Sequence, residues 1–239
     1  MGFIKPTLPT SIQFYLTSGY PCSYLPNRNA RSLVAAPAHL INNQSYPPLI
    51  EVGFRRSGTF TYKPHCEHCQ ACTPIRVDST QFTPSRSQRR ALKRFAHLQA
   101  FKKPLAWDEE HYALYRLYQA ERHAGSEMDS DDKSQYIDFL LTSQVNSYLI
   151  EFRDTSQLVM VALVDELPNG LSAVYTFFDP AIAGLGIYAI LWQILYCQQN
   201  QLPWLYLGYW IEQSRKMSYK TQFVPYQLFS HGQWIVPPA

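Results

Sequence analysis

A chain of 239 residues can bury a sizeable core, and its 46% hydrophobic and 16% charged residues exclude a disordered protein. It has no window of the ~20 apolar residues that a membrane span needs and no N-terminal apolar run, so we expect neither a membrane span nor a secretory signal. The 5 cysteines are clustered and odd in number, which argues against a disulfide framework and favours a reducing, cytoplasmic compartment.

The net charge of +3 conceals opposite charges in the two halves of the chain. Residues 1–105 carry 14 Lys and Arg against 3 Asp and Glu, whereas residues 106–239 carry 7 against 15. A cationic first half can hold a polyanion or an acidic substrate. The change of sign places a domain boundary near Lys102–Pro104. We therefore expect a basic domain over residues 1–104 and a second domain over residues 105–239.

The first eighty residues are predicted to be short strands joined by loops. Their patterns give a strand within residues 10–20, a proline-rich extended segment around Cys22, a loop over residues 42–48, a hairpin of strands over residues 49–56 and 58–63, and a strand over residues 74–79. Between the hairpin and the last strand lies a C-x2-C-x2-C run of Cys66, Cys69 and Cys72.

A basic amphipathic helix is predicted over residues 85–101, with a hydroxyl cap at its start and an apolar stripe that includes Phe95. Its cations fall mostly on one sector of the helix: Arg86, Arg89, Arg90, Lys93 and Arg94. Such a run is either a solvated surface or a phosphate-binding face. The density of cations with no acid among them favours phosphate contact.

The second half combines helices and longer strands. We expect helices over residues 108–124 and 129–142, strands over residues 147–152, 158–165 and 171–178, a helix over residues 187–199, a strand over residues 203–209, and short strands at residues 219–220, 226–229 and 233–236. A hairpin turn around Asn169-Gly170 joins the second and third strands. Gly184-Leu185-Gly186 forms a glycine turn before the apolar helix.

This order of elements resembles the fold of GNAT-type acetyltransferases. We expect an α+β protein: a GNAT-like acyltransferase domain, with a central, mostly antiparallel sheet flanked by helices, preceded by a smaller basic α+β domain with a Cys-rich loop. In the GNAT fold, backbone N–H groups at a helix N-terminus bind a phosphate or a carbonyl oxygen. The GNAT cofactor motif, Q/R-x-x-G-x-G/A, would require Gln or Arg where this chain has Ala181. That departure argues against coenzyme A as the acyl donor.

Several long runs are shared with a known family. They are CSYLP, GFRRSGTFTYKPHCEHCQACTPIRV, SRSQRR, YTFFDP, LG-x-YAILWQI, YLGYWI and KMSYK. Through them the chain, from about residue 12 to about residue 230, resembles the bacterial aspartate/glutamate leucyltransferases of the arginyl-tRNA–protein transferase superfamily. One departure is Gly184-Leu185-Gly186-Ile187, where the family pattern leads us to expect Ser-Leu-Gly-Thr. The hydroxyl groups are lost there, but the backbone donors remain.

The resemblance implies the transfer of leucine from leucyl-tRNA to a protein with N-terminal Asp or Glu, which marks that protein for N-end rule degradation. Aminolysis of an aminoacyl ester is exergonic, so positioning and oxyanion stabilisation suffice and the chemistry requires no cofactor. Three alternatives stay open: arginyl transfer from arginyl-tRNA, as in relatives outside bacteria; coenzyme A-dependent acetyl transfer; and a non-enzymatic zinc- or RNA-binding module. The sequence leaves the oligomeric state open.

For this reaction the first domain offers cations. Binding of the acceptor carboxylate requires a basic pocket, and guanidinium groups bind carboxylates bidentately. The candidates flank the cysteine run: Arg55, Arg56, Lys63 and, as the preferred one, Arg76. The alternative for each of these residues is a charged side chain on the surface with no role in binding. The tRNA phosphates would contact the cations of the 85–101 helix together with Lys102 and Lys103.

The second domain offers residues around the glycine turn. The candidate catalytic residues are Tyr175, Thr176, Asp179, Gly186 and Tyr219. The candidate substrate-binding residues are Phe177, Phe178, Leu185, Tyr206, Gly208, Tyr209, Lys216 and Lys220. If the strands over residues 171–178 and 203–209 splay, their aromatic side chains can stack the terminal adenine of tRNA. Buried core is the alternative for Phe177 and Tyr206.

Cys22, Cys66, Cys69 and Cys72 can supply four thiolates to a zinc ion or an iron–sulfur cluster. Eukaryotic members of the superfamily use N-terminal cysteines in this way. Against this assignment, zinc ribbons use two separated C-x2-C pairs, and Cys22 lies far upstream of the other three. Reduced thiols that only pack are the alternative.

Overall fold

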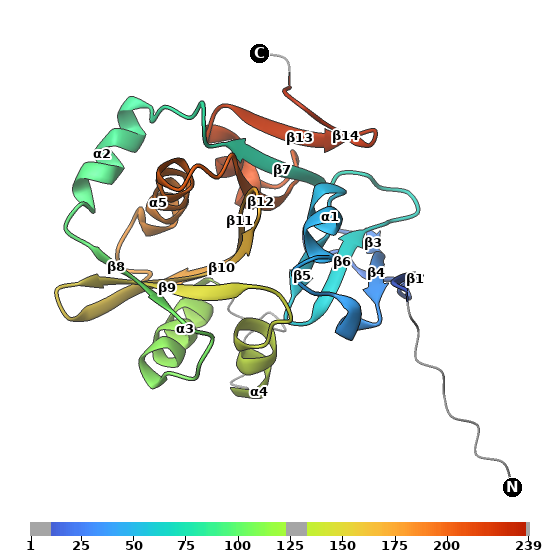
Figure 1. Ribbon diagram of the computed structural model, residues 1–239, viewed down its shortest axis with the longest axis horizontal. Helices are drawn as coiled ribbons and strands as arrows, with labels where there is room; N and C mark the ends of the chain where they lie inside the picture. Colours follow the sequence, from blue (N-terminus) through green and yellow to red (C-terminus); the bar gives the residue numbers. More distant parts are fainter. Residues whose placement is uncertain (1–10, 123–132, 238–239) are drawn as a thin grey trace, which may run out of the picture.

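A computed structural model gives the fold of residues 11–122 and 133–237, which are the residues described here (Figure 1). The strands are β1 (Gln13–Leu16), β2 (Tyr20–Pro21), β3 (Asn29–Ala30), β4 (Ser32–Ala36), β5 (Arg55–Ser57), β6 (Phe60–Pro64), β7 (Thr73–Asp78), β8 (Gln99–Lys103), β9 (Ser147–Asp154), β10 (Gln157–Leu167), β11 (Gly170–Phe178), β12 (Trp204–Trp210), β13 (Tyr226–Ser230) and β14 (Gln233–Ile235). The α-helices are α1 (Tyr46–Glu51), α2 (Arg86–Arg94), α3 (Glu109–Arg122), α4 (Lys133–Tyr136) and α5 (Leu185–Gln199). Three further helical turns are η1 (Ala38–Leu40), η3 (Ile137–Leu141) and η4 (Arg215–Gln222).

The strands form one large sheet and one smaller sheet. The large sheet has eight strands in the order β14-β13-β7-β12-β11-β10-β9-β8, and the smaller has four in the order β1-β4-β6-β5. In the large sheet every assigned pair is antiparallel except β11 with β12. The predicted α+β class, with a large, mostly antiparallel sheet flanked by helices and a smaller N-terminal unit, is confirmed.

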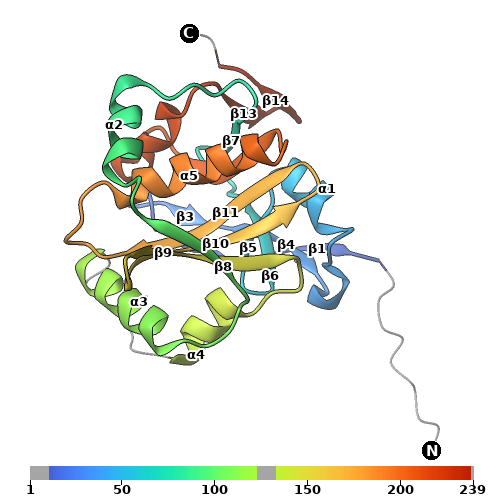
Figure 2. The same cartoon turned by 60° about the vertical axis from the view of Figure 1, so that its left-hand side comes forward.

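Helices cover both faces of the large sheet. Figure 2 shows α5 and α2 above the sheet and α3 and α4 below it. On the first face Tyr188 of α5 packs with Phe95 and Phe178, and on the second Tyr115 of α3 packs with Phe177. The alternation of side chains along β11 therefore places Phe177 and Phe178 in two different cores.

The smaller sheet is joined to the large one through α1. Tyr46 and Ile50 of this helix pack with Phe54 and with two residues of the large sheet, Leu167 and Tyr206. This cluster fixes β5 beside β11, and that contact builds the site described below.

Most predicted elements of the second half are confirmed. The three strands after residue 147, the apolar helix α5 and the strand β12 all occur at the expected places. The last turn of the helix predicted over residues 108–124 and the first turn of the helix predicted over residues 129–142 lie outside the described residues.

The predicted helix over residues 85–101 is too long. It ends at Arg94, and residues 99–103 form β8, which pairs with β9. The Leu98 N–H donates to the Phe95 carbonyl oxygen at 3.0 Å, which closes a turn between the two elements. The apolar stripe predicted the buried face of α2, but pairing with β9 determined where the helix stops.

Two other expectations are wrong. Residues 42–48 were expected to be a loop that leads into a strand, but α1 begins at Tyr46, with prolines in its first turn where no N–H donor is needed. Residues 219–220 were expected to be a strand but lie in η4, a 3₁₀ helix.

Both predicted domains contribute to the large sheet, because β7 and β8 precede residue 105. The boundary at residues 104/105 stays a prediction. Among the described residues, none of the helices is long and apolar enough to span a membrane.

Candidate active site

The parallel strands β11 and β12 separate part-way along their length. Residues 170–172 pair with residues 204–206, and beyond them the two strands no longer pair with each other. The pairing of β12 with β7 is irregular between Tyr206 and Tyr209. Within this interval Gly208 has a φ of +78°, a left-handed conformation that favours glycine. On the GNAT-like fold expectation these two strands would splay near the donor site, and in the structure their mutual pairing ends after residues 172 and 206.

Arg55 of β5 lies where the two strands part. Its Nη1 donates to Ser172 Oγ at 2.8 Å and its Nη2 to the Ala173 carbonyl oxygen at 2.5 Å. A Cβ atom on Gly208 would lie 3.4 Å from Arg55 Nε, so the guanidinium contacts both strands. Among the described residues, no carboxylate forms an ion pair with it. Arg55 is therefore a cation held in place by neutral acceptors alone.

A second cation reaches the same segment of β12 from η4. Lys220 Nζ donates to the carbonyl oxygens of Leu207 at 2.8 Å and Tyr209 at 2.6 Å, the residues on either side of Gly208. Burial, and then the charge of Arg55, lower the pKa of Lys220 to about 7.

Both cations line a cavity of about 1030 Å³ between the two sheets and the helices α3 and η3. Its other walls include Tyr62, Tyr115 and Tyr175. Among the described residues, Asp138 is the one carboxylate on its lining. Burial raises the pKa of Tyr175, so this phenol stays protonated at neutral pH.

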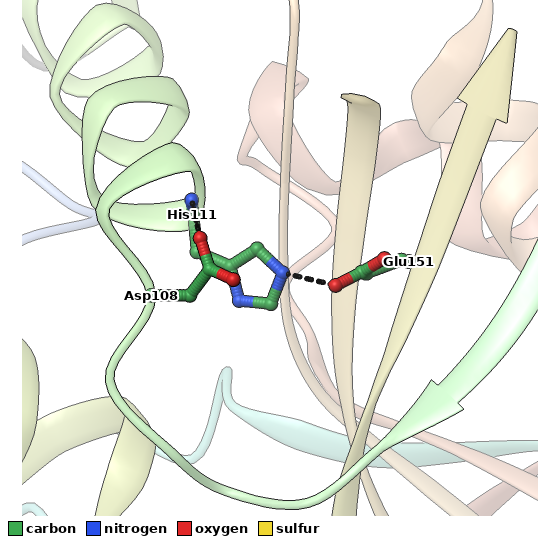
Figure 3. A group of neighbouring side chains, drawn as sticks. All are labelled: Asp108, His111 and Glu151. Carbon is green, nitrogen blue, oxygen red and sulfur yellow. Dashed lines mark hydrogen bonds and ion pairs between the residues drawn. The ribbon is translucent and has the colours of Figure 1, made fainter. Parts of the chain in front are cut away.

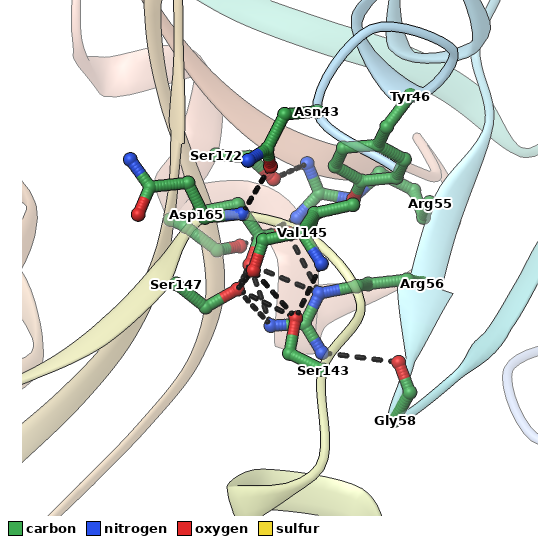
Figure 4. A network of polar contacts seen from close by, with 12 residues as sticks. Asn43, Tyr46, Arg55, Arg56, Gly58, Ser143, Val145, Ser147, Asp165 and Ser172 are labelled. Carbon is green, nitrogen blue, oxygen red and sulfur yellow. Dashed lines mark hydrogen bonds and ion pairs between the residues drawn. The ribbon is translucent and has the colours of Figure 1, made fainter. Parts of the chain in front are cut away.

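Arg56 contributes to the same cavity wall, but its guanidinium belongs to a buried network (Figure 4). It forms an ion pair with Asp165, whose carboxylate also accepts from Tyr46 at 2.9 Å and from Ser147 at 2.7 Å. Arg56 Nη1 donates to the Gly58 carbonyl oxygen at 3.1 Å. With these partners, the Arg56 cation is already neutralised by the protein.

The chain matches a known family over most of its length. Residues 20–90 match the family described as "Arginine-tRNA-protein transferase, N terminus", and residues 110–230 match the one described as "Arginine-tRNA-protein transferase, C terminus". The chain belongs to the arginine-tRNA-protein transferase family.

Similar members of this family carry a narrower name. A protein from Thiobacillus denitrificans, "Aspartate/glutamate leucyltransferase", is 57% identical over 97% of this chain and 98% of its own length. Proteins of the same name from Nitrosospira multiformis and Chromobacterium violaceum are 54% and 51% identical, each over 95% of this chain and over 92% and 95% of their own lengths. The predicted resemblance and the predicted enzyme class, an aminoacyltransferase, are confirmed.

The cavity of this transferase gathers six of the predicted site residues. They are Arg55, Arg56, Tyr175, Gly208, Tyr209 and Lys220. The Tyr209 hydroxyl donates to the Gly53 carbonyl oxygen at 2.8 Å, which makes this ring a fixed part of the wall. The cavity brings together residues of β5, β11 and β12, which come from both halves of the sequence.

Arg76, the preferred candidate for the acceptor carboxylate, lies outside this cavity. Its guanidinium is 3.7 Å from the centre of the Trp204 ring and 4.3 Å from that of Trp234, and it forms an ion pair with Glu51 at 3.0 Å. It also donates to Gln227 at 2.8 Å. The sequence could not indicate this, because the stacking residues come from β12 and β14.

Other candidates also lie away from the cavity. Lys63 lies over the Phe54 ring, 5.0 Å from its centre. Lys216 is exposed, and Tyr219 is half-buried with its pKa raised by burial to about 12. Phe177, Phe178 and Tyr206 are buried, and the Tyr206 hydroxyl donates to Glu51.

The glycine turn lies on the α5 side of the sheet. Gly184 is the N-cap of α5 with a φ of +99°, Leu185 is buried, and a Cβ atom on Gly186 would lie 3.2 Å from the Phe178 ring. Asp179 accepts from the Ala181 N–H at 2.9 Å and so shapes the loop before this turn. Thr176, paired with Ala162, is half-buried in β11. None of these residues lines the cavity around Arg55.

The cations of α2 are all exposed: Arg86, Arg89, Arg90, Lys93 and Arg94. Among the described residues, none of them forms an ion pair, and Arg94 reaches within 3.9 Å of the position of a Cβ atom on Gly184. Lys102 and Lys103 differ, because they pair with Glu166 at 3.1 Å and Glu151 at 3.7 Å. The free basic surface is therefore α2 and lies beside the glycine turn.

Cys22, Cys66, Cys69 and Cys72 face a second cavity of about 400 Å³. Burial and the charges of the other three thiols raise the pKa of Cys72 to about 12. The Leu25 N–H donates to Cys22 Sγ at 3.4 Å. Cysteine sulfur is a ligand type that thiophilic cations favour, but among the described residues no three of these sulfur atoms lie within 4.8 Å of one another.

Sequence reasoning missed a buried charge cluster at the start of α3 (Figure 3). His111 Nε2 lies 2.8 Å from Glu151 Oε1, and Asp108 caps the helix by accepting from the Glu110 N–H at 2.8 Å. Arg153 pairs with the other oxygen of Glu151 at 3.0 Å. The only sequence signal was the acidic first turn, because Glu151 lies forty residues further along the chain.

Proposed function

We propose that this chain transfers leucine from leucyl-tRNA to the N-terminal Asp or Glu of acceptor proteins, and that it does so in the cavity around Arg55 and Lys220. Relatives that are 51% to 57% identical over nearly the full chain are named for that activity. The observation that carries the assignment to this cavity is the Arg55 guanidinium, a half-buried cation without a carboxylate partner among the described residues.

The acceptor N-terminus brings two opposite charges. Its side-chain carboxylate pairs with the Arg55 guanidinium, which makes short bonds to neutral oxygens only. Its α-ammonium enters a cavity whose lining carries the Asp138 carboxylate. A lysine or arginine at the acceptor N-terminus would place its charge against Arg55 and be rejected.

For the donor end we propose a GNAT-like arrangement, although the glycine turn itself does not line the cavity around Arg55. The opening between β11 and β12 holds the aminoacyl ester, and backbone N–H groups at the start of α5 lie toward the tRNA terminus. The exposed cations of α2, beside Gly184, contact tRNA phosphates. Charged tRNA as donor implies a cytoplasmic protein.

A zinc ion or iron–sulfur cluster held by Cys22, Cys66, Cys69 and Cys72 would have a structural role. It would tie the β2–β3 turn to the loop before β7 and relieve repulsion among the thiolates. The transfer chemistry itself takes no step through it.

A transfer assay tests the proposal. Purified protein is given leucyl- or arginyl-tRNA with peptides that begin with Asp, Glu, Lys or Arg. We expect label only from leucyl-tRNA and only on the Asp and Glu peptides. Label from arginyl-tRNA would establish the arginyl alternative. No label from either donor, with tRNA binding intact, would indicate a non-enzymatic RNA-binding module. Acetylation of a peptide with acetyl-coenzyme A would indicate an acetyltransferase.

The tRNA surface is tested by salt dependence. Replacing Arg89 and Arg90 with Gln should lower the slope of log K against log salt by about 0.7–0.9 per lost phosphate contact. The matched control replaces Lys102 and Lys103, which already have acidic partners. An unchanged slope in the Arg89/Arg90 variant would contradict the assignment of α2, and a loss in the Lys102/Lys103 variant would extend the tRNA surface to β8.

A further inference from the structure

The Lys220 amine enters the cavity without an acid beside it. Its Nζ donates to two backbone carbonyl oxygens, and among the described residues it forms no ion pair. The charged group that faces it is Arg55, a like charge. The other titratable groups on the cavity lining are Tyr24, Arg56, Tyr62, Tyr115, Asp138, Tyr175 and Tyr209. Burial and Arg55 together lower the pKa of Lys220 to about 7.

The hydrogen bonds suit a neutral amine. A neutral lysine has two N–H bonds and one lone pair. The carbonyl oxygens of Leu207 and Tyr209, at 2.8 and 2.6 Å, take both N–H bonds. The lone pair is therefore left for a group inside the cavity.

We propose that Lys220 accepts the proton that the acceptor α-ammonium must lose before it attacks the aminoacyl ester. An ammonium has no lone pair and cannot attack a carbonyl carbon, so a base at this place speeds the reaction below the pKa of the acceptor amine. The proposal rests on the proposed transfer function and adds to it the group that moves the proton.

The placement beside Arg55 supplies the geometry. Arg55 Nε is 3.4 Å from the position of a Cβ atom on Gly208, and Lys220 binds the carbonyls on both sides of that glycine. In an N-terminal Asp the α-amine is bonded to the Cα atom, and the side-chain carboxylate is one Cβ atom away from it. A carboxylate on Arg55 therefore brings the amine next to Lys220.

The atoms balance without a further reactant. Lys220 takes one proton from the α-ammonium, and the amine nitrogen forms a bond to the ester carbon. The ester C–O bond breaks, and the ribose oxygen that leaves takes one proton. The proton on Lys220 passes to water, the proton that the ribose oxygen takes is the second one from the amine nitrogen, and the third hydrogen stays on the new amide nitrogen. Leucine ends on the acceptor and the tRNA ends with a free hydroxyl group.

The experiment is single-turnover transfer from leucyl-tRNA to an Asp-initiated peptide between pH 6 and 9. It compares wild type with Lys220→Met and Lys220→Arg. The control is Arg215→Met, an exposed cation of the same helix η4. Arg215→Met should match wild type. Lys220→Arg keeps a donor for both carbonyls but cannot lose its proton, so it separates a base from a structural cation.

We expect wild-type transfer to rise with pH around 7, following loss of the Lys220 proton. Both Lys220 variants should be about 10²- to 10⁴-fold slower at pH 7. Their remaining rate should rise only near pH 8, with the acceptor amine itself. The Kd for tRNA should stay unchanged. Added primary alkylamines should partly rescue Lys220→Met.

Wild-type speed in Lys220→Arg would overturn the proposal and leave Lys220 a structural cation. So would a wild-type profile without a rise between pH 6 and 8, which needs no variant to fold. Absence of transfer by wild type is a different outcome, because it contradicts the proposed function itself.

Discussion

Two consecutive residues, Arg55 and Arg56, have opposite environments. Successive side chains of a strand point to opposite faces, so β5 sends them in different directions. The Arg56 side chain is 3% exposed and pairs with Asp165, whose side chain is fully buried. Arg55 contacts Ser172 and Ala173 and has no carboxylate partner among the described residues.

Arg56 is a cation that holds the fold, whereas Arg55 is the cation that we propose binds the acceptor carboxylate. Arg56 connects the small sheet to β10 of the large one, and all its bonds stay within the protein. Arg55 sits at the opening between β11 and β12, where an added anion would complete its coordination. Breaking each in turn should therefore give a stability loss in one case and an activity loss in the other.

The largest effect is expected from Arg56→Met. This change leaves the Asp165 carboxylate buried without its cation, which should cost about 3–5 kcal/mol of unfolding free energy. Urea unfolding monitored by circular dichroism measures it. The double variant Arg56→Met/Asp165→Leu removes both charges and should be more stable than the single variant. If the double variant is the less stable one, the pair is not the source of the loss.

The next effect is expected from Arg55→Met. The acceptor carboxylate loses its partner, so kcat/KM for Asp and Glu peptides should fall about 10²-fold, about 2.7 kcal/mol. Unfolding free energy should change by only about 1 kcal/mol, because two hydrogen bonds to neutral groups are lost. Steady-state transfer assays measure the first and urea unfolding the second. Full activity in Arg55→Met would move the acceptor site elsewhere.

The sequence predicted the family, but only the structure shows which partners each candidate residue has. Arg55, Arg56 and Lys220 were all expected to bind substrate, but nothing local distinguishes two adjacent arginines. Their difference depends on Asp165, which lies more than a hundred residues away. The contacts of Arg76 could not be read locally either, because Trp204 and Trp234 stack on it from distant strands.

Hydrophobic periodicity within one segment was a better guide to secondary structure than to these long-range contacts. The long strands and α5 follow patterns within one segment, and the structure has them. The end of α2 depends instead on β8 pairing with β9, and α1 depends on burial against the large sheet. Patterns within one segment thus predicted the long strands and α5. Contacts with distant segments determined where α2 ends and that α1 is a helix.

A smaller effect is expected from Gly208→Ala, which tests the wall that both cations share. The residue has a φ of +78°, and its new Cβ atom would lie 3.4 Å from Arg55 Nε. The left-handed backbone should cost about 1–2 kcal/mol of unfolding free energy. Transfer should slow as well, because Arg55 must move. Gly232→Ala is the matched control, since its φ is +79° and its Cβ atom would meet nothing within 4 Å. Gly232→Ala should lose stability but keep the wild-type transfer rate.

The smallest effect is expected at an exposed ion pair, where the contrast with Arg56 is sharpest. The hydrogen bond from Arg153 lowers the pKa of Glu110, whose side chain is 49% exposed. A lowered folded-state pKa adds stability above the unfolded pKa, and this contribution disappears as the pH falls through the folded value. Glu110→Gln should therefore cost less than about 1 kcal/mol at pH 7, because solvent screens the pair. The difference from wild type should shrink to zero on acidification below about pH 4.3. Glu109→Gln, in the same first turn of α3, controls for the helix dipole in urea titrations at each pH. A cost for Glu110→Gln that persists unchanged in acid would show that shape, and not charge, sets its contribution.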